Sequence, residues 1–397
     1  MTLPVEGVTV VDMSRYIPGA YCTMILGDMG ADVIRVEQPF RSRQSTSSGA
    51  ETTPPGEHAD AYSGLYRNKK SIGLNLKTDE GKKAFYKLVE KADVVVESSR
   101  PLVAKRLGVD YETLSRINPS VIYCSITGYG QDGPYRDMPG HDINYLSMTG
   151  VLGILNEGGS GPPIVSGVKL ADIGGGSFQA TVGILLALLA REKTGKGQYV
   201  DIAMADGIMS WLTRPAAMYF ETGEAPEPGV VAMDGKRPGF YPYRTKDGGY
   251  ISFGLREEKL FQNMCRAIGR EDLIPDQNAP SPRREEVIAE LQQVFLTKNR
   301  DEWFEFLREK DISVSPVHTL PEAFNDPHFI HREMVVELDH PEAGKVKQLG
   351  IPIKLSDTPG RIARFAPKLG EHNEEILLDL GYSKEDMARM RAAGAIN

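Results

Sequence analysis

The sequence predicts an α/β protein in which helices cover both faces of a parallel sheet. The first observation is that short, β-branched apolar runs alternate with helix-length segments over about the first 125 residues, and strands separated by helices normally pair in parallel. The second is the apolar run at residues 182–190, which indicates a buried helix. The third is the composition, since 41% hydrophobic and 25% charged residues are ordinary for a globular protein.

The first region supplies the expected sheet. Five short runs rich in Val and Ile are predicted to be its strands: residues 8–12, 31–37, 71–76, 93–97 and 121–126. Residues 21–29 and 78–92 are predicted helices, and the second has acidic residues early and lysines later, as the helix dipole favours. Ligands of parallel sheets bind at the carboxyl ends of the strands. We therefore expect the functional site at that edge.

The remaining chain is predicted to hold a smaller domain. Residues 42–58 are rich in Ser, Thr, Gly and Pro and are expected to form a surface loop, and residues 226–238 indicate a linker. A strand at residues 250–253 precedes helices near residues 259–268, 283–297 and 300–310. A short helix is expected at residues 383–393. The sequence predicts a large first domain at residues 1–225 and a small α+β domain at residues 226–325. Residues 326–397 are predicted to return to the large domain.

Composition excludes several classes of function. The formal net charge is −8 and the isoelectric point about 5.6, which argues against a nucleic-acid partner. We expect no membrane association, because no stretch has about 18 uninterrupted apolar residues. The N-terminus lacks the features of a signal peptide. Three distant cysteines fit a reducing cytoplasm and argue against disulfides or a zinc site.

The candidate chemistry lies between residues 140 and 190. The segment Gly-His-Asp-Ile-Asn-Tyr at residues 140–145 is followed by Asp172 and three glycines at residues 174–176. A carboxylate beside glycines and an apolar helix stands where backbone can approach a ligand and water is scarce. Simpler explanations stay open at this point: Asp172 as a helix cap, His141 as a structural loop residue and Tyr145 as a packed core residue.

Several motifs together resemble those of one enzyme family. The chain carries the opening segments at residues 4–12 and 27–37, Arg-Asn-Lys-Lys-Ser-Ile at 67–72, Gly-Tyr-Gly-Gln-Asp-Gly-Pro at 128–134 and Thr-Gly-Lys-Gly-Gln-Tyr-Val-Asp at 194–201. These resemble the family III (CaiB/BaiF) CoA-transferase superfamily, over essentially the whole chain. The resemblance implies a Rossmann-like large domain, a smaller domain, an interlocked homodimer and a CoA thioester substrate, with no metal or redox cofactor. The alternative assembly adds a homologous second subunit.

The resemblance implies one of two chemistries. In the 2-methylacyl-CoA racemases, His141 would be the base on one face of the substrate, Asp172 with Tyr145 would serve the other, and Glu257 would orient the histidine. Backbone N–H groups near residues 172–174 are expected to stabilise the enolate oxygen. In the transferases, Asp172 would attack the thioester and form a mixed anhydride that passes CoA to a carboxylic acid.

The active-site motif and the flanking segments favour different branches. The racemase motif at residues 140–145 is intact, whereas family transferases usually carry Tyr or Phe in place of the histidine. Residues 331–341, 349–356 and 369–377 look more like the transferases. We give the site more weight, because it does the chemistry, and we expect epimerisation of 2-methyl-branched acyl-CoA. CoA transfer is the alternative, and a catalytically silent CoA-binding subunit is a third hypothesis.

The resemblance also implies contacts for the CoA nucleotide. The matching positions are Tyr16, Ile17, Arg100 and Arg106. Gln38 stands where the family has a basic residue, so Arg41 or Arg43 is expected to replace that contact.

Overall fold

The computed structural model describes residues 2–39, 59–155, 162–224 and 237–397. Contacts between residues separate the chain into two compact units, which are described one at a time. The first unit comprises Met1–Thr149, Ser166–Trp211 and Pro327–Asn397. The second comprises Gly150–Val165 and Leu212–Asp326. The predicted surface loop at residues 42–58, with Arg41 and Arg43, lies outside the described residues.

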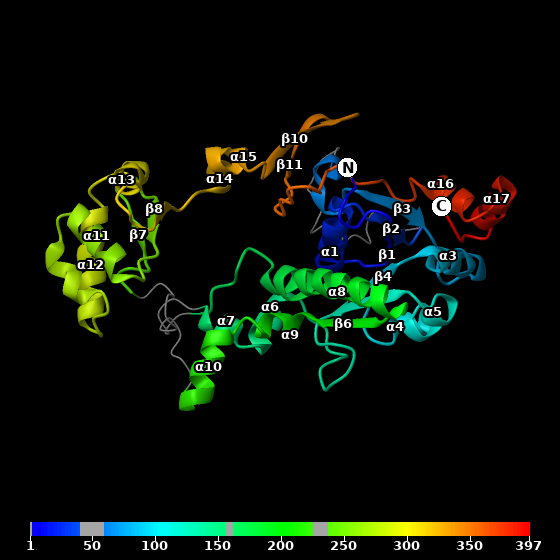
Figure 1. The fold of residues 1–397 in the computed structure, drawn as a ribbon, viewed down its shortest axis with the longest axis horizontal. Helices are drawn as coiled ribbons and strands as arrows, with labels where there is room; N and C mark the ends of the chain where they lie inside the picture. The colour runs from blue at the N-terminus through cyan, green and yellow to red at the C-terminus, as the bar shows by residue number, and fades with distance from the viewer. Residues whose placement is uncertain (1, 40–58, 156–161, 225–236) are drawn as a thin grey trace. The chain divides into compact units, whose positions relative to one another are not determined.

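The first unit is built on a six-stranded sheet in the order β3-β2-β1-β4-β5-β6 (Figure 1). Its strands are β1 (Thr9–Asp12), β2 (Asp32–Glu37), β3 (Lys69–Gly73), β4 (Val94–Glu97), β5 (Ile122–Thr127) and β6 (Tyr199–Ala203). Every neighbouring pair is parallel, so the predicted parallel sheet is confirmed. The strand order reverses between β1 and β4, and this is the point at which such sheets place a ligand.

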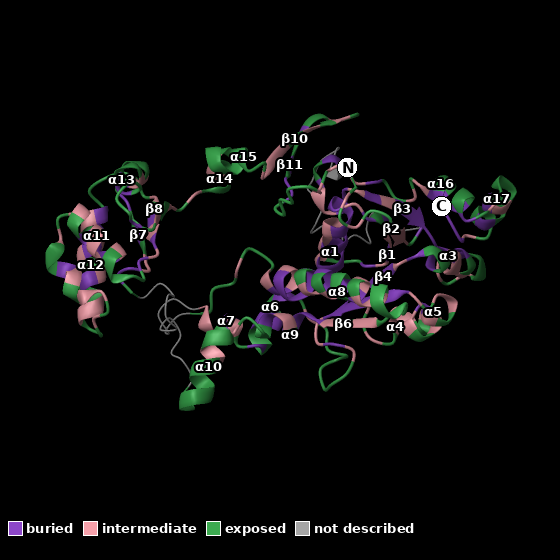
Figure 2. Ribbon diagram, viewed as in Figure 1, coloured by how far each residue is buried: buried purple, intermediate pink, exposed green. Residues whose placement is uncertain are grey.

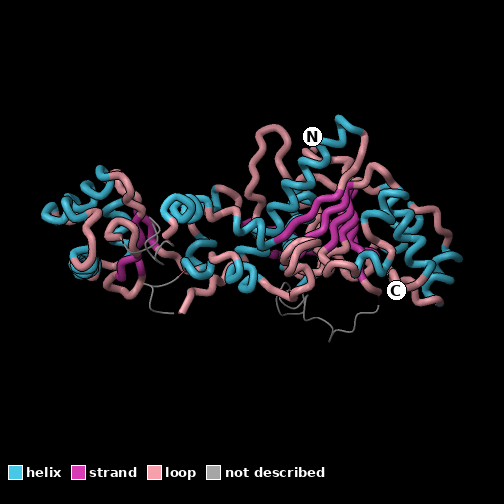
Figure 3. Tube along the Cα trace, turned by 90° about the horizontal axis from the view of Figure 1, so that it is seen from below, coloured by secondary structure: helices cyan, strands magenta, loops and turns pink. Residues whose placement is uncertain are grey.

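Helices cover both faces of this sheet, as Figure 3 shows. Helix α1 (Ile17–Asp28) and helix α8 (Gln179–Thr194) contact each other, and α8 also lies against β5 and β6. A buried core joins the sheet to α3 (Asp79–Lys91), α5 (Tyr111–Ile117) and the C-terminal helices α16 (Asn373–Asp379) and α17 (Lys384–Ala392). The shorter helices are α2 (Ala59–Tyr62), α4 (Val103–Leu107), α6 (Asp142–Met148), α9 (Met204–Met209) and α15 (Pro327–His331).

The C-terminal segment of the chain returns to the first unit. Strands β10 (Val335–His340) and β11 (Gly344–Leu349) form an antiparallel hairpin. The backbone N–H of Asn75, just after β3, donates to the carbonyl of Ala395. The buried side chains of Leu377 and Ile396 belong to the sheet's core. The last part of the sequence therefore stabilises the sheet that the first part forms.

The second unit has an antiparallel sheet of β7 (Pro242–Arg244), β8 (Tyr250–Phe253) and β9 (Val314–Pro316). Its helices are α7 (Val151–Ile154), α10 (Thr213–Thr222), α11 (Glu258–Ala267), α12 (Arg283–Phe295), α13 (Arg300–Leu307) and α14 (Leu320–Asn325). Aromatic residues fill its core, where the Phe295 ring packs at an angle against Tyr243, Phe253 and Trp303. This unit contains the α+β elements that the sequence predicts there.

One continuous helical stretch, Leu170–Thr194, is long and apolar enough to meet a length-and-composition test for a membrane span. The expectation of no membrane association rests on uninterrupted apolar residues alone. A buried core helix passes the same test, and 44% of the tested window is buried. The stretch also packs on the sheet and on α1. It is thus weak support for a membrane segment.

Candidate active site

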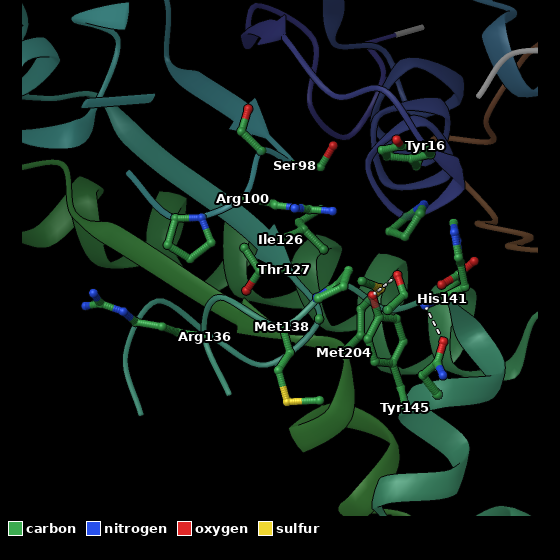
Figure 4. Close-up of a pocket in the computed structure, with 18 of the residues that line it drawn as sticks. Tyr16, Ser98, Arg100, Ile126, Thr127, Arg136, Met138, His141, Tyr145 and Met204 are labelled. Atoms are coloured by element: carbon green, nitrogen blue, oxygen red, sulfur yellow. Dashed lines mark hydrogen bonds between the residues drawn. The ribbon is translucent and has the colours of Figure 1, made fainter. Parts of the chain in front are cut away.

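A cavity of about 400 Å³ opens at the carboxyl edge of the parallel sheet. Its walls come from the segments after β1, β4 and β5, from the start of α6 and from η3, a π-helical segment (Leu170–Phe178). His141, Tyr145 and Asp172 all line this cavity, and Figure 4 shows the first two. The structure therefore brings three predicted site residues together at the expected edge of the sheet.

His141 and Tyr145 are held by the first turn of α6. His141 precedes the helix, in extended backbone, and its backbone N–H donates to Asn144 Oδ1 at 3.0 Å. The Tyr145 hydroxyl donates to the Gly140 carbonyl at 2.6 Å. A side chain on Gly128 or Gly140 would collide with the Tyr145 ring, about 2.5 and 2.6 Å away. The aromatic ring therefore leaves no room for a side chain at Gly128 or at Gly140, the residue directly before the histidine.

Tyr145 has electrostatic surroundings that keep its phenol protonated. Burial, and next the negative charge of Asp172, raise the pKa of Tyr145 well above its usual value. The positive charge of Arg100 acts in the opposite direction. The phenol is thus close enough to feel the Asp172 carboxylate, while its proton is donated to Gly140. In this structure it supports the backbone beside His141.

Asp172 lies in the first turn of η3, which continues directly into α8. The residue directly before α8 is Phe178 and not Asp172. The explanation of Asp172 as a simple N-terminal cap of α8 is therefore wrong. The three glycines at residues 174–176 face other parts of the protein rather than a ligand. In chain order, a Cβ added to each would lie 2.1 Å from Trp211, 2.4 Å from the Met204 carbonyl and 2.9 Å from the Met204 side chain. The glycines allow α9 and Trp211 to pack closely.

Asp142 is a site residue that the sequence reasoning missed. Its carboxylate is 5% exposed, and Oδ1 accepts the backbone N–H groups of Ala171 at 2.7 Å and Asp172 at 3.0 Å. It therefore ties the start of α6 to the backbone that carries Asp172. The signal was available, since Asp142 stands inside the motif at residues 140–145, but the motif alone does not say which acid points into the protein.

These hydrogen bonds also correct an expectation about the enolate oxygen. The N–H of Asp172 donates to Asp142, and the N–H of Ile173 donates to the Lys169 carbonyl at 3.1 Å. Both groups are engaged within the protein, so these two do not fit the expected role as donors to an enolate in this structure. The expected role of the Gly174 N–H stays a prediction.

The predicted nucleotide contacts fall into three groups. Tyr16, Ile17 and Arg100 line the large cavity, and Figure 4 shows Arg100 extending into it. Arg106, in the last turn of α4, lines neither this cavity nor the second one described below. Arg41 lies outside the described residues. Arg100 therefore lies with the reactive groups rather than at a separate phosphate site.

A second cavity of about 90 Å³ lies at the same edge of the sheet. Three cationic side chains, Arg15, Arg35 and Lys77, line it together with apolar residues and two acids, Glu37 and Glu97. Arg35 forms an ion pair with Glu37 at 3.1 Å. Ser99 lines both cavities. Apolar walls suit the flat base of a nucleotide, and nearby positive charges suit its phosphate groups. Sequence reasoning missed this set because its members come from separate segments.

Glu257 belongs to the second unit, where it precedes α11 and is exposed. Its role in orienting His141 stays a prediction. In the part of the chain that the structure describes, no group of three or more His, Cys, Asp or Glu side chains could hold a metal ion. Cys22, Cys124 and Cys265 are buried and free.

Comparisons with known proteins identify the family of this chain. The family model for "CoA-transferase family III" matches residues 5–373. The chain is 34% identical to the succinyl-CoA:mesaconate CoA-transferase of Haloarcula marismortui, over 95% of this chain and 96% of that protein. It is 31% identical to the human alpha-methylacyl-CoA racemase, over 98% of this chain and 97% of that one.

The fold comparison gives the same result. A solved structure of a CaiB/BaiF family protein from Brucella suis matches with a TM-score of 0.82 and 30% sequence identity, over 96% of this chain and 100% of that one. From the matched sequence model, the two relatives and this structure, we conclude that the chain belongs to CoA-transferase family III.

Proposed function

We propose that the protein epimerises 2-methyl-branched acyl-CoA thioesters by removing the α-proton and returning one to the opposite face. The observation that carries this proposal is that His141 and Asp172 line one cavity. An imidazole and a carboxylate are the side chains best suited to exchange protons near neutral pH, and each such group typically contributes about 10²–10⁴-fold. The human racemase among the relatives is consistent with the proposal.

The proposed reaction needs no oxidant and no acceptor. One base takes the proton from the carbon next to the thioester, and the electron pair moves onto the thioester oxygen to give an enolate. The acid opposite then donates a proton to the other face of that carbon, and the carbonyl re-forms. His141 and Asp172 would exchange these roles in the reverse direction. Arg100, which extends into the same cavity, would favour the negative charge of the enolate.

The direct test is mass spectrometry of an (R)-2-methylacyl-CoA incubated with the purified protein in D₂O without any acceptor acid. We expect one deuterium at the α-carbon together with loss of stereochemical purity. Absence of exchange across several branched acyl-CoAs would contradict epimerisation.

CoA transfer is the second candidate, and named relatives support it. Besides the archaeal enzyme, the human succinyl-CoA:glutarate CoA-transferase is 31% identical over 99% of this chain. In this reaction the Asp172 carboxylate would attack the thioester carbonyl and release CoA thiolate, which gives a mixed anhydride. The thiolate would then attack the Asp172 acyl carbon, which releases the donor acid and leaves an aspartyl-CoA thioester. The acceptor carboxylate would take up CoA by the same two steps in reverse, which restores Asp172. Intact-protein mass spectrometry after acyl-CoA addition distinguishes the two, because only the transferase accumulates a covalent adduct that the Asp172→Asn variant cannot form.

We also propose that the protein works as a homodimer. The outer face of α8 is apolar and accessible: Val182, Leu186 and Leu189 are 52%, 60% and 57% exposed. Figure 2 shows stretches of α8 coloured as exposed. Such a face on a long helix normally packs against another surface. Light scattering of the purified chain should give twice the chain mass, and a monomer at micromolar concentration would contradict the proposal.

A further inference from the structure

The connection between β1 and α1 lies at the boundary of the two cavities. Its first three residues, Met13, Ser14 and Arg15, line the small cavity, and its last residue, Tyr16, lines the large one together with Ile17, the first residue of α1. The same short segment therefore shapes both cavities. A shift in its backbone would change both at once.

A buried carboxylate holds the start of this connection. Asp12, the last residue of β1, is 1% exposed. Its Oδ1 accepts the backbone N–H of Ser14 at 2.8 Å and the Ser14 hydroxyl at 2.6 Å. Its Oδ2 accepts the hydroxyl of Thr23, in α1, at 2.6 Å. One carboxylate thus links the end of the strand, the connection and the helix that follows.

Lys69 completes this arrangement from β3. Its side chain is fully buried, and Nζ lies 3.3 Å from Asp12 Oδ2. The same ammonium donates to the Thr23 hydroxyl at 2.7 Å and to the Ala20 carbonyl at 2.9 Å. Burial by itself would raise the pKa of Asp12, but Lys69, Ser14 and Thr23 outweigh it and lower the pKa below its usual value. Asp12 is therefore an anion at neutral pH.

Close packing leaves the connection little room to move. An added Cβ on Gly19 would lie 2.2 Å from the Ser14 side chain, so the serine is pressed against the first turn of α1. The backbone N–H of Arg15 donates to the Ser98 hydroxyl at 3.1 Å, which joins the connection to the segment after β4. Ser98 also lines the large cavity. The anchor therefore reaches two of the segments that form this cavity.

We propose that the buried Asp12–Lys69 pair positions residues 13–18 so that one acyl-CoA molecule can occupy both cavities. The pair does not line the large cavity or the small one; it acts through the Ser14 backbone. The inference rests on the proposed acyl-CoA substrate, whichever of the two reactions takes place. Removing the charges while keeping an acceptor for Ser14 should preserve binding, whereas removing the acceptor should weaken it.

Two double variants separate anchoring from charge burial. Asp12→Asn/Lys69→Met keeps an oxygen that can accept the Ser14 N–H, and Asp12→Leu/Lys69→Met has none. Both replace a buried ion pair with uncharged groups, which often leaves folding intact. The matched control is Asp28→Leu/Arg67→Met, because this pair is equally buried, at 2.7 Å, and lines neither cavity.

The first readout is the dissociation constant for coenzyme A, measured by titration calorimetry. We expect the Leu/Met variant to bind about 10-fold more weakly, as for the loss of one or two hydrogen bonds, and the Asn/Met variant and the control to bind within about 3-fold of wild type. Equal binding by the Leu/Met and Asn/Met variants would overturn the proposal.

The second readout is backbone hydrogen exchange over residues 13–18, which does not depend on any ligand. We expect faster exchange in the Leu/Met variant alone, and unchanged exchange there would also overturn the proposal. A wild-type protein that fails to bind coenzyme A would contradict the proposed function. The exchange measurement would still show whether Asp12 and Lys69 hold residues 13–18 in place. Should the Leu/Met variant not fold, Ser14→Ala removes one of the bonds to Asp12, and a smaller change of the same kind is expected.

Discussion

The two cavities at the edge of the sheet differ in the chemistry of their walls. The large one brings together an imidazole, a phenol and a carboxylate from His141, Tyr145 and Asp172. The small one has apolar walls, three cationic side chains and two acids, Glu37 and the buried Glu97. The first can move protons or form an acyl bond, and the second suits recognition of an anionic, partly flat group. Reaction and recognition thus occupy neighbouring but separate places.

This difference makes a general prediction about kinetics. Substitutions in the large cavity should lower kcat, because they remove groups that act in the transition state, whereas substitutions in the small one should raise KM with kcat unchanged. The kinetic predictions below test that division.

The largest effect is expected for Asp172→Asn. The amide can neither accept the α-proton nor attack a thioester, so kcat should fall by about 10²–10⁴-fold in either reaction. Coenzyme A affinity should stay within about 3-fold, because the small cavity is untouched. Steady-state kinetics measures kcat, and calorimetry measures the affinity for coenzyme A. Full activity of the variant would show that Asp172 takes no part in the reaction.

His141→Gln is expected to be next. An epimerase should lose about 10²–10⁴-fold in kcat, since a glutamine cannot carry the proton. A transferase needs only the Asp172 nucleophile and should retain much of its rate. Full epimerase activity in this variant would contradict our preference between the two reactions.

Asp142→Ala should lower kcat by about 10–100-fold with little change in KM. The backbone N–H groups of Ala171 and Asp172 would lose a charged acceptor, and hydrogen bonds to charged groups are worth about 1.5–3 kcal/mol. The control is Asp110→Ala, which removes a carboxylate that accepts the backbone N–H of Thr113 at the start of α5. The control should lose about 1 kcal/mol of stability and no activity. A similar kcat loss in both variants would show that Asp142 is merely structural.

In the small cavity, Arg15→Ala should raise KM for acyl-CoA by about 3–10-fold, the range of an exposed charge contact. Arg106→Ala should have less effect, because Arg106 lies outside the lining of both cavities. Steady-state kinetics at two salt concentrations checks this, since screening should weaken the Arg15 contribution. The reverse order of effects would place the nucleotide at α4.

The smallest effect concerns pH. Burial raises the pKa of Glu97, with its hydrogen bonds to Ser125 and Ser99 opposing the shift. A raised pKa in the folded state means that folding binds a proton, so this group adds stability as the pH falls from above the folded pKa to below the unfolded one. Glu97→Gln should therefore gain stability relative to wild type at pH 8, and the gain should shrink toward pH 5. Denaturant unfolding at both values tests it, and a gain that grows toward pH 5 would contradict the shift.

The parallel sheet could be predicted because its strands are buried on both faces and read as apolar runs, as Val10, Val33 and Val95 illustrate. Strand β6 escaped prediction, since Tyr199–Ala203 carries Asp201 and is only partly buried. It becomes a strand by pairing with β5, and this partner is far away in the sequence.

Part of the site could be predicted in the same way. His141, Tyr145 and Asp172 stood out as residue types near glycines and an apolar helix. The groups that hold them in place did not, because a contact such as Lys69 with Asp12 joins residues 57 positions apart. No local pattern marks one acid as buried and another as exposed until the chain has folded.

The central claim is that His141 and Asp172 serve opposite faces of the α-carbon. Its most direct test follows α-deuterium incorporation from D₂O into each epimer of a 2-methylacyl-CoA separately, with the His141→Ala and Asp172→Asn variants. We predict that each variant still exchanges one epimer, that the two variants exchange different epimers, and that neither interconverts them. If both variants exchange the same epimer, or if the wild-type protein exchanges neither, the two-base account is contradicted.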